Sequence, residues 1–144
     1  MTKRSDEQGR YTGLRALEAF AECTDEELKR IDSLLSETSI SEGRVMMREG
    51  ETGLEFIVIL EGRATVTRSG SELATLGPGD FVGEMALLSD EIQPRSATVT
   101  AATPMRVYVM NAGEFSALLN EVPTMREKIQ RTKAVRNHPA GKKV

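Results

Sequence analysis

The feature that most constrains the fold is a series of short β-forming runs between residues 38 and 110, separated by glycine turns. The runs are Val45–Arg48, Glu55–Leu60, Ala64–Arg68, Glu72–Leu76, Ala97–Ala101 and Arg106–Met110. Short strands at close, even spacing are typical of a barrel or jelly roll. A doubly wound parallel sheet needs a helix-length crossover between strands, and no segment here fits one. We therefore predict a mainly β protein built on a β-roll, with flanking helices.

Helical patterns precede the roll. Apolar residues recur at helical spacing from Leu14 onward. Thr24 and Glu27 have the spacing of a capping box, in which the Thr24 hydroxyl accepts from the Glu27 amide and the Glu27 carboxylate reaches back. We expect the helix that follows to end near Glu37. The polar residues 1–13 are expected to form a mobile arm.

Helical patterns also follow the roll. Asn111 can cap one helix, and Pro123 stands where a further helix can begin. Residues 137–144 contain a proline and a glycine and are expected to form a flexible tail. The predicted domain spans residues 14–136, divided into helices at 14–37, the β-roll at 38–110 and helices at 111–136.

Composition indicates a soluble, cytoplasmic chain. Hydrophobic residues make up 39% of it and charged residues 28%, which is typical of a globular domain. No apolar run approaches the roughly 20 residues that span a bilayer, and no apolar stretch at the N-terminus indicates a signal peptide. The single cysteine, Cys23, cannot form an internal disulfide, which favours a reducing compartment.

The charge is unevenly distributed. From Arg126 onward there are seven basic residues and one acidic residue, giving a charge of +6. Because the net charge of the chain is −3, residues 1–125 carry −9. An acidic body argues against general binding of nucleic acid. We interpret the basic end as a solvated helix face followed by a loose tail.

Residue types needed for catalysis or metal binding do not cluster in the sequence. His138 is the only histidine and has no cysteine or carboxylate cluster nearby, so we expect no metal site. Cys23 has no evident base partner and is interpreted as a helix-packing residue. We therefore expect no cofactor and no enzymatic activity.

The segment from Phe81 to Thr98 carries the chemistry that remains. Glu84 to Leu88 is predicted to form one short helical turn between strands, entered through Gly83. A helix N-terminus offers free amides and a positive dipole end, which suit an anion. Arg95, stiffened by the preceding proline, can present its planar fork of donors to phosphate oxygens. The Ser96 hydroxyl and the Ser96 and Ala97 amides can add donors.

This segment resembles the phosphate-binding cassette of cyclic-nucleotide-binding domains, found in kinase regulatory subunits, catabolite activator proteins and gated channels. The matching residues are Gly83-Glu84-Met85-Ala86-Leu87-Leu88 and Pro94-Arg95-Ser96-Ala97-Thr98-Val99. Further strand and turn signatures resemble the family at Arg48–Glu51, Phe56–Gly62 and Leu76–Phe81. The resemblance covers residues 14–135.

The resemblance implies a role for each matching position. Glu84 would accept from the ribose 2′-hydroxyl, and Arg95 would pair with the exocyclic phosphate oxygens. The amides of Met85, Ala86 and Ala97, together with the Ser96 hydroxyl, would complete the phosphate cradle. Apolar walls for the sugar and base would come from Val82 and Leu73.

The sequence departs from the family pattern at two places. The loop Ser89–Gln93 is longer than is common and carries two acidic residues near an anion site, which bears on affinity. Leu54 and Glu55 also stand where the family often has a small polar residue, a change that concerns the strand more than the site.

Two functions follow from this reading. The first is a sensor of cyclic nucleotide, cAMP before cGMP, in which the ligand changes the arrangement of the C-terminal helices. The alternative is a protein-interaction module with the same fold and an empty or reassigned pocket. Either way, we expect the output to lie in a protein partner or in a domain outside this chain. A regulator with its own helix-turn-helix is not favoured, because little sequence follows the C-terminal helices.

Overall fold

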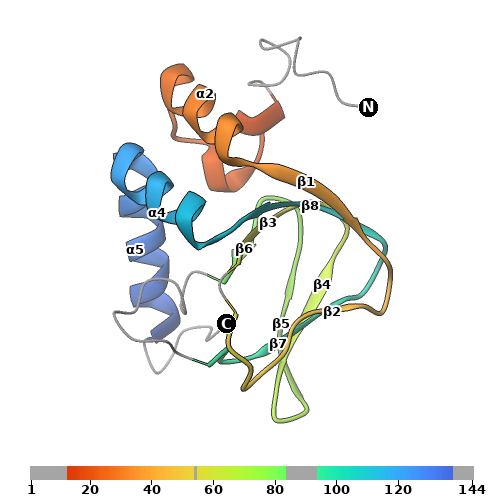
Figure 1. Ribbon diagram of the computed structural model, residues 1–144. Coiled ribbons are helices and arrows are strands. Elements are labelled where there is room, and N and C mark those ends of the chain that lie inside the picture. The colour runs from red at the N-terminus through yellow and green to blue at the C-terminus, as the bar shows by residue number, and fades with distance from the viewer. Residues whose placement is uncertain (1–12, 54, 84–93, 138–144) are drawn as a thin grey trace.

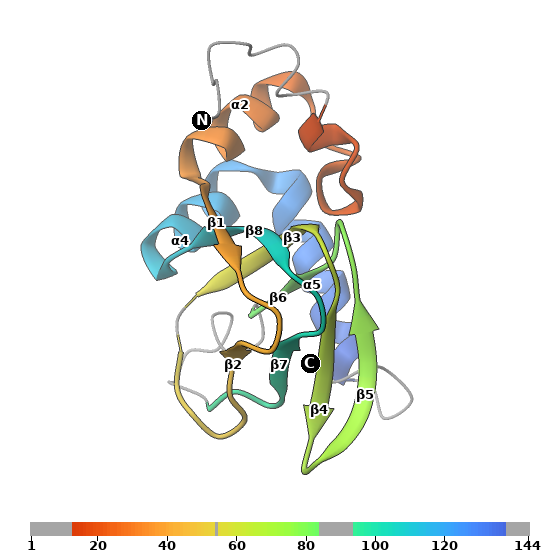
Figure 2. The same cartoon turned by 90° about the vertical axis from the view of Figure 1, so that its right-hand side faces the viewer.

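Two antiparallel sheets of four strands each form the body of the molecule, as Figures 1 and 2 show. The computed structural model describes residues 13–53, 55–83 and 94–137, with side chains as far as 132. The first sheet has the order β1-β8-β3-β6, from Ser36–Ile40, Met105–Met110, Phe56–Glu61 and Phe81–Val82. The second has the order β2-β7-β4-β5, from Val45–Met47, Thr98–Ala101, Ala64–Arg68 and Ser71–Leu76. The predicted β-roll is confirmed.

The hairpin of β4 and β5 shows how the sequence dictates a local fold. In β4, Ala64 and Val66 are buried while Thr65 and Thr67 are only half-buried, the alternation of a sheet with one covered face. Its two-residue turn, Ser69-Gly70, has positive φ at both positions. This is the backbone conformation of the hairpin turns whose twist matches that of the flanking strands.

The start of the roll differs from the expectation. The helix that we expected to end near Glu37 ends at Leu34, and β1 begins at Ser36. The run Ser36–Ile40 is mostly polar, and only Ile40 in it is buried. Its hydrophobic periodicity therefore does not reveal it as a strand. It is a strand because it pairs along its whole length with β8. The two-residue strand β6 was also missed.

The flanking helices begin where their capping residues predict. After a short 3₁₀ turn, η1 (Glu18–Phe20), α2 spans Asp25–Leu34, and Thr24 and Glu27 form both hydrogen bonds of the capping box. The second capping box, between Asn111 and Glu114, starts α4 (Ala112–Glu121). Helix α5 (Pro123–Asn137) follows directly from Pro123. Figure 1 shows α2 and α4 at one end of the roll, with α5 running alongside it.

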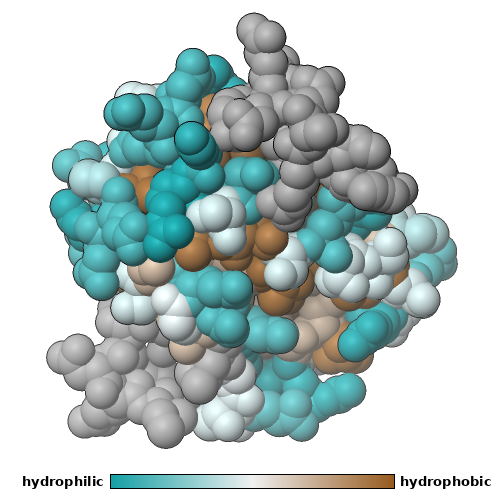
Figure 3. Space-filling view, turned by 45° about the horizontal axis from the view of Figure 1, so that its top comes forward, coloured by the Kyte–Doolittle hydropathy of each residue, from teal (hydrophilic) through white to brown (hydrophobic). Residues whose placement is uncertain are grey.

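The first sheet separates two hydrophobic clusters. Strand β3 contributes Phe56 and Val58 to the cluster under the helices, and Ile57 and Ile59 to the cluster between the sheets. Because both of its faces are covered, its apolar run is continuous rather than alternating. Figure 3, which views the helical end, shows hydrophilic side chains around small apolar patches. Among the described residues, no helix has the length and apolarity that a bilayer crossing needs.

Candidate nucleotide site

Arg95 is the one charged residue with a buried side chain in the described part of the chain, at 8% exposure. It lies between Pro94 and β7, and its guanidinium reaches across to the first sheet. Nη2 donates to the Glu55 carbonyl at 3.1 Å, and Nη1 donates to the Gly83 carbonyl at 3.3 Å. The arginine therefore joins the segment before β3 and the residue after β6, from which the expected cassette helix departs.

The backbone of Arg95 is also held. Its N–H donates to the Glu51 carbonyl at 2.8 Å, and its own carbonyl accepts from Gly50 N–H at 2.9 Å. An isolated antiparallel bridge between Thr52 and Pro94 adjoins these bonds. The loop 48–53 thus acts as a short strand partner for the arginine segment, and both ends of the arginine residue are fixed.

Two glycines leave the space that the guanidinium fills. Gly83 has a φ of +102°, and a Cβ there would collide with the Glu55 carbonyl oxygen. At Gly53 a Cβ would lie 2.8 Å from both Nε and Nη2 of Arg95, closer than real contacts allow. Gly83 is therefore required by backbone conformation, whereas Gly53 is required by the position of one side chain.

The residues after Arg95 lie at the entrance to β7. Ala97 is buried and Ser96 half-buried, and the Ser96 carbonyl accepts from Arg68 Nε at 2.7 Å. Neither Arg68 and Glu49 as supporting residues nor the steric role of Gly53 was predicted from the sequence. Gly53 is visible as a glycine next to the strand signature, but nothing in the sequence places it or Arg68 against the arginine segment.

The other predicted site residues lie in different surroundings. Val82 is 1% exposed and belongs to the cluster between the sheets, whereas Leu73 is 39% exposed on the edge strand β5. Glu84, Met85 and Ala86 lie outside the described residues, as does the loop Ser89–Gln93. Their roles, and those of Val82 and Leu73 as walls, stay predictions.

Among the residues that the structure describes, the other titratable groups do not form a second reactive or metal-binding site. Burial, followed by the nearby Glu27 carboxylate, raises the pKa of the Cys23 thiol to about 11, which disfavours the reactive thiolate. In the described ranges no three His, Cys, Asp or Glu side chains are grouped so as to hold a metal ion.

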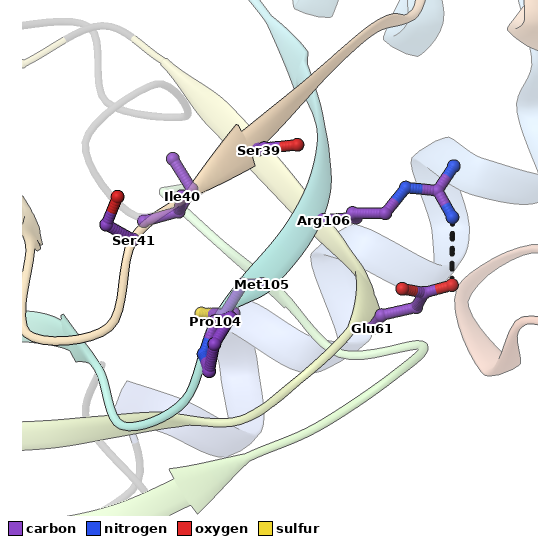
Figure 4. Close-up of a pocket in the computed structure, with 7 residues that line it drawn as sticks. All are labelled: Ser39, Ile40, Ser41, Glu61, Pro104, Met105 and Arg106. Atoms are coloured by element: carbon purple, nitrogen blue, oxygen red, sulfur yellow. Dashed lines mark hydrogen bonds and ion pairs between the residues drawn. The ribbon is translucent and has the colours of Figure 1, made fainter. Parts of the chain in front are cut away.

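A shallow cavity of about 410 Å³ lies at the end of β1 and β8, apart from the residues around Arg95 (Figure 4). Its lining includes Arg106 and Glu61, joined by a 2.8 Å ion pair. Arg106 also donates to Glu37, and the hydrogen bond to that carboxylate is the main cause that raises the pKa of Arg106. The Arg106 guanidinium is therefore already paired with two carboxylates and is not available to hold an anion in the cavity.

Comparison with known proteins supplies the family. The protein-family sequence model of the cyclic nucleotide-binding domain matches residues 37–122, a range that includes the buried Arg95 and its hydrogen-bond partners. The chain belongs to the cyclic nucleotide-binding domain family. The resemblance drawn from the residues is confirmed.

Relatives of this domain occur within longer proteins. The chain is 42% identical over 90 residues to a cyclic nucleotide-gated potassium channel of Rhizobium etli, covering 62% of this chain and 24% of the channel. It is 41% identical over 96 residues to a cAMP-dependent protein kinase regulatory subunit of Yarrowia lipolytica, covering 65% and 25%. The chain thus spans about a quarter of the length of these relatives.

The fold is also that of a solved structure, cAMP-bound PfPKA-R. The two superpose with a TM-score of 0.77 at 24% identity, over 88% of this chain and 43% of that one. At this identity the likeness shows the fold alone.

Proposed function

We propose that this domain binds a cyclic nucleotide, cAMP before cGMP, and that Arg95 is the residue that pairs with the cyclic phosphate. The observation that carries the proposal is the burial of this guanidinium, which donates to the backbone carbonyls of Glu55 and Gly83. A guanidinium is a planar fork of donors, a geometry that fits two phosphate oxygens. Relatives named as cyclic nucleotide-gated or cAMP-dependent support the choice of ligand.

A chain of aromatic rings gives a route from this site to the C-terminal helices. Phe81, which lies two residues before Gly83, packs on Phe56 with ring centroids 5.4 Å apart. Phe56 packs in turn on Phe115 of α4 at 4.7 Å. A ligand that shifts the cassette end of β6 would therefore change the packing surface of α4. We propose that the nucleotide selects one of two arrangements of α4 and α5.

The helices at this end are joined to one another by polar contacts. The Glu27 carboxylate of α2 accepts hydrogen bonds from the Thr124 hydroxyl of α5 at 3.0 and 2.9 Å. Arg30 of α2 donates to Glu121 of α4 at 2.6 and 3.0 Å. A displacement of α4 would thus be passed to both α2 and α5, and these three helices form the output surface that we propose.

Calorimetric titration with cAMP and with cGMP tests the binding proposal. The parent protein should release or absorb heat with a saturable isotherm, and Arg95→Ala should weaken binding by about 2–5 kcal/mol, as for removing one partner of a desolvated charge pair. Arg63→Ala is the matched control, because Arg63 is exposed at the far end of β4 and carries the same charge. A parent protein that gives no heat at high micromolar ligand would refute the proposal and favour the interaction module.

We further propose that the domain is a non-catalytic regulatory module of the cytoplasm. It would act on a protein partner or on an output domain outside these residues, because its relatives carry this domain within much longer chains. Pull-down of a partner that is unaffected by nucleotide and by Glu84→Ala would instead indicate that the pocket no longer serves a ligand.

A further inference from the structure

Arg68 is the last residue of β4. Its side chain contacts the segment Arg95-Ser96-Ala97, which precedes β7, beyond the point where the backbone pairing of β4 and β7 ends. The paired residues of β4 and β7 end at Thr67 and Thr98. Past that point, Arg68 Nε donates to the Ser96 carbonyl at 2.7 Å, in a partly buried setting. A hydrogen bond from a charged donor is stronger than a neutral one, so it can replace the ladder where the strands diverge.

The planarity of the peptide bond gives this contact a consequence on its other side. The Ser96 carbonyl and the Ala97 N–H belong to one rigid, trans peptide unit and point in opposite directions. Arg68 therefore sets the direction of the Ala97 N–H by holding the Ser96 oxygen. Within the described residues no hydrogen bond occupies that N–H, although Ala97 is buried.

Glu49 supports the same arrangement from the neighbouring loop. Its side-chain Oε1 accepts from Ser69 N–H at 2.9 Å, and its own N–H donates to the Thr98 hydroxyl at 2.9 Å. The hairpin turn that directly follows Arg68 is thereby tied to the loop that holds the Arg95 backbone.

We propose that Arg68 is a positioning residue of the phosphate site, which aims the Ala97 N–H into the cradle by fixing the Ser96 carbonyl. This inference rests on the proposed function for its ligand. The orientation of the peptide, however, is a property of the free protein and can be measured without a nucleotide.

The experiment has two readouts on the same variants. Amide resonances of ¹⁵N-labelled free protein report the Ala97 peptide, and calorimetry with cAMP reports the dissociation constant. In Arg68→Ala the Ala97 resonance should move and cAMP should bind roughly tenfold more weakly, as expected for losing a charge-assisted hydrogen bond that acts through one donor. Arg68→Lys keeps a donor and should give intermediate values, while Arg63→Ala should leave both readouts at parent values.

The outcomes separate the two proposals. If the parent protein binds neither cAMP nor cGMP, the proposed function fails, and the Ala97 resonance alone decides the role of Arg68. If Arg68→Ala keeps the parent resonance, the positioning role is wrong even where affinity falls, because the loss then reflects charge alone. Parent-like affinity in a well-folded Arg68→Ala also overturns it. Should Arg68→Ala fail to fold, the comparison of Arg68→Lys with Arg63→Ala applies the same criteria.

Discussion

The substitution Gly53→Ala should displace the Arg95 guanidinium without removing it, so it tests whether the position of this group matters. The added Cβ would lie 2.8 Å from Nε and Nη2 and 3.1 Å from Cζ, so it meets only the far end of one flexible side chain. The backbone of Gly53 does not have a positive φ, so alanine introduces no strain there. The substitution therefore forces the guanidinium to move while leaving the chain path intact.

The expected effect on stability is small. The displaced guanidinium gives up or lengthens its bonds of 3.1 Å to the Glu55 carbonyl and 3.3 Å to the Gly83 carbonyl. A hydrogen bond involving a charged group contributes about 1.5–3 kcal/mol, but both bonds here are longer than the roughly 2.9–3.0 Å that is commonest for N–H···O bonds. Alanine also reduces the entropy of the unfolded chain by about 0.4–1 kcal/mol. We expect a net loss of about 1–2 kcal/mol.

The expected effect on ligand binding is larger. Removing the arginine altogether should cost about 2–5 kcal/mol, and moving it forfeits part of that amount. We therefore expect cAMP to bind about 10- to 100-fold more weakly, or about 1.4–2.8 kcal/mol. Calorimetry gives the affinity and urea unfolding the stability. Gly77→Ala is the matched control, because no heavy atom lies within 4 Å of a Cβ at Gly77 and its φ is not positive.

A double-mutant cycle makes the reasoning refutable. If Gly53 acts only through Arg95, adding Gly53→Ala to Arg95→Ala should change the affinity no further, and the effects of the two single variants should not add. Additive losses would show that Gly53 contributes through the loop 48–53 instead. If Gly53→Ala alone binds cAMP with the parent affinity, the added Cβ does not displace the guanidinium and the reasoning from the contact distances is wrong.

Two further predictions concern the helical end. Burial acts to raise the pKa of Glu27, but hydrogen bonds from Thr24 and Thr124 outweigh it and lower the pKa below the usual 4.5. A carboxyl whose pKa is lower in the folded state stabilises the fold at pH values above its unfolded-state pKa. This stabilisation is lost as the pH falls through the folded-state pKa. Urea unfolding from pH 6 to pH 3 should therefore show a shallower loss in Glu27→Gln than in the parent, and parallel curves would contradict this. Phe115→Ala should cost about 3–5 kcal/mol of unfolding free energy, because the ring is fully buried against Phe56; a loss under 1 kcal/mol by the same assay would contradict its place in the core.

The sequence predicts best the elements that local chemistry determines. Both helix starts follow from capping residues, at Thr24 and Asn111, and the bounds of β4 follow from alternation closed by a glycine turn. Strand β1 could not be predicted in this way. Its residues are mostly exposed, so their burial shows little pattern, and the strand forms through pairing with β8, which is distant in sequence.

In the candidate site, too, local sequence features could be predicted but contacts between distant segments could not. Arg95 was predicted as a site residue from its joint spacing with Gly83 and Ser96-Ala97-Thr98, which resembles the phosphate-binding cassette, because alone it would be interpreted as a surface arginine. What holds it could not be predicted, because Gly53, Glu55 and Arg68 contact it or its neighbour only after the two sheets have formed. The supporting contacts go largely to main-chain carbonyls, which every residue has, so the side-chain identity of an acceptor such as Glu55 carries no signal. The residues that support such a site are thus found where a side chain is absent, as at Gly53, or where it reaches a segment distant in sequence, as at Arg68. Variants at these two positions should alter affinity without removing any group that we expect to touch the ligand.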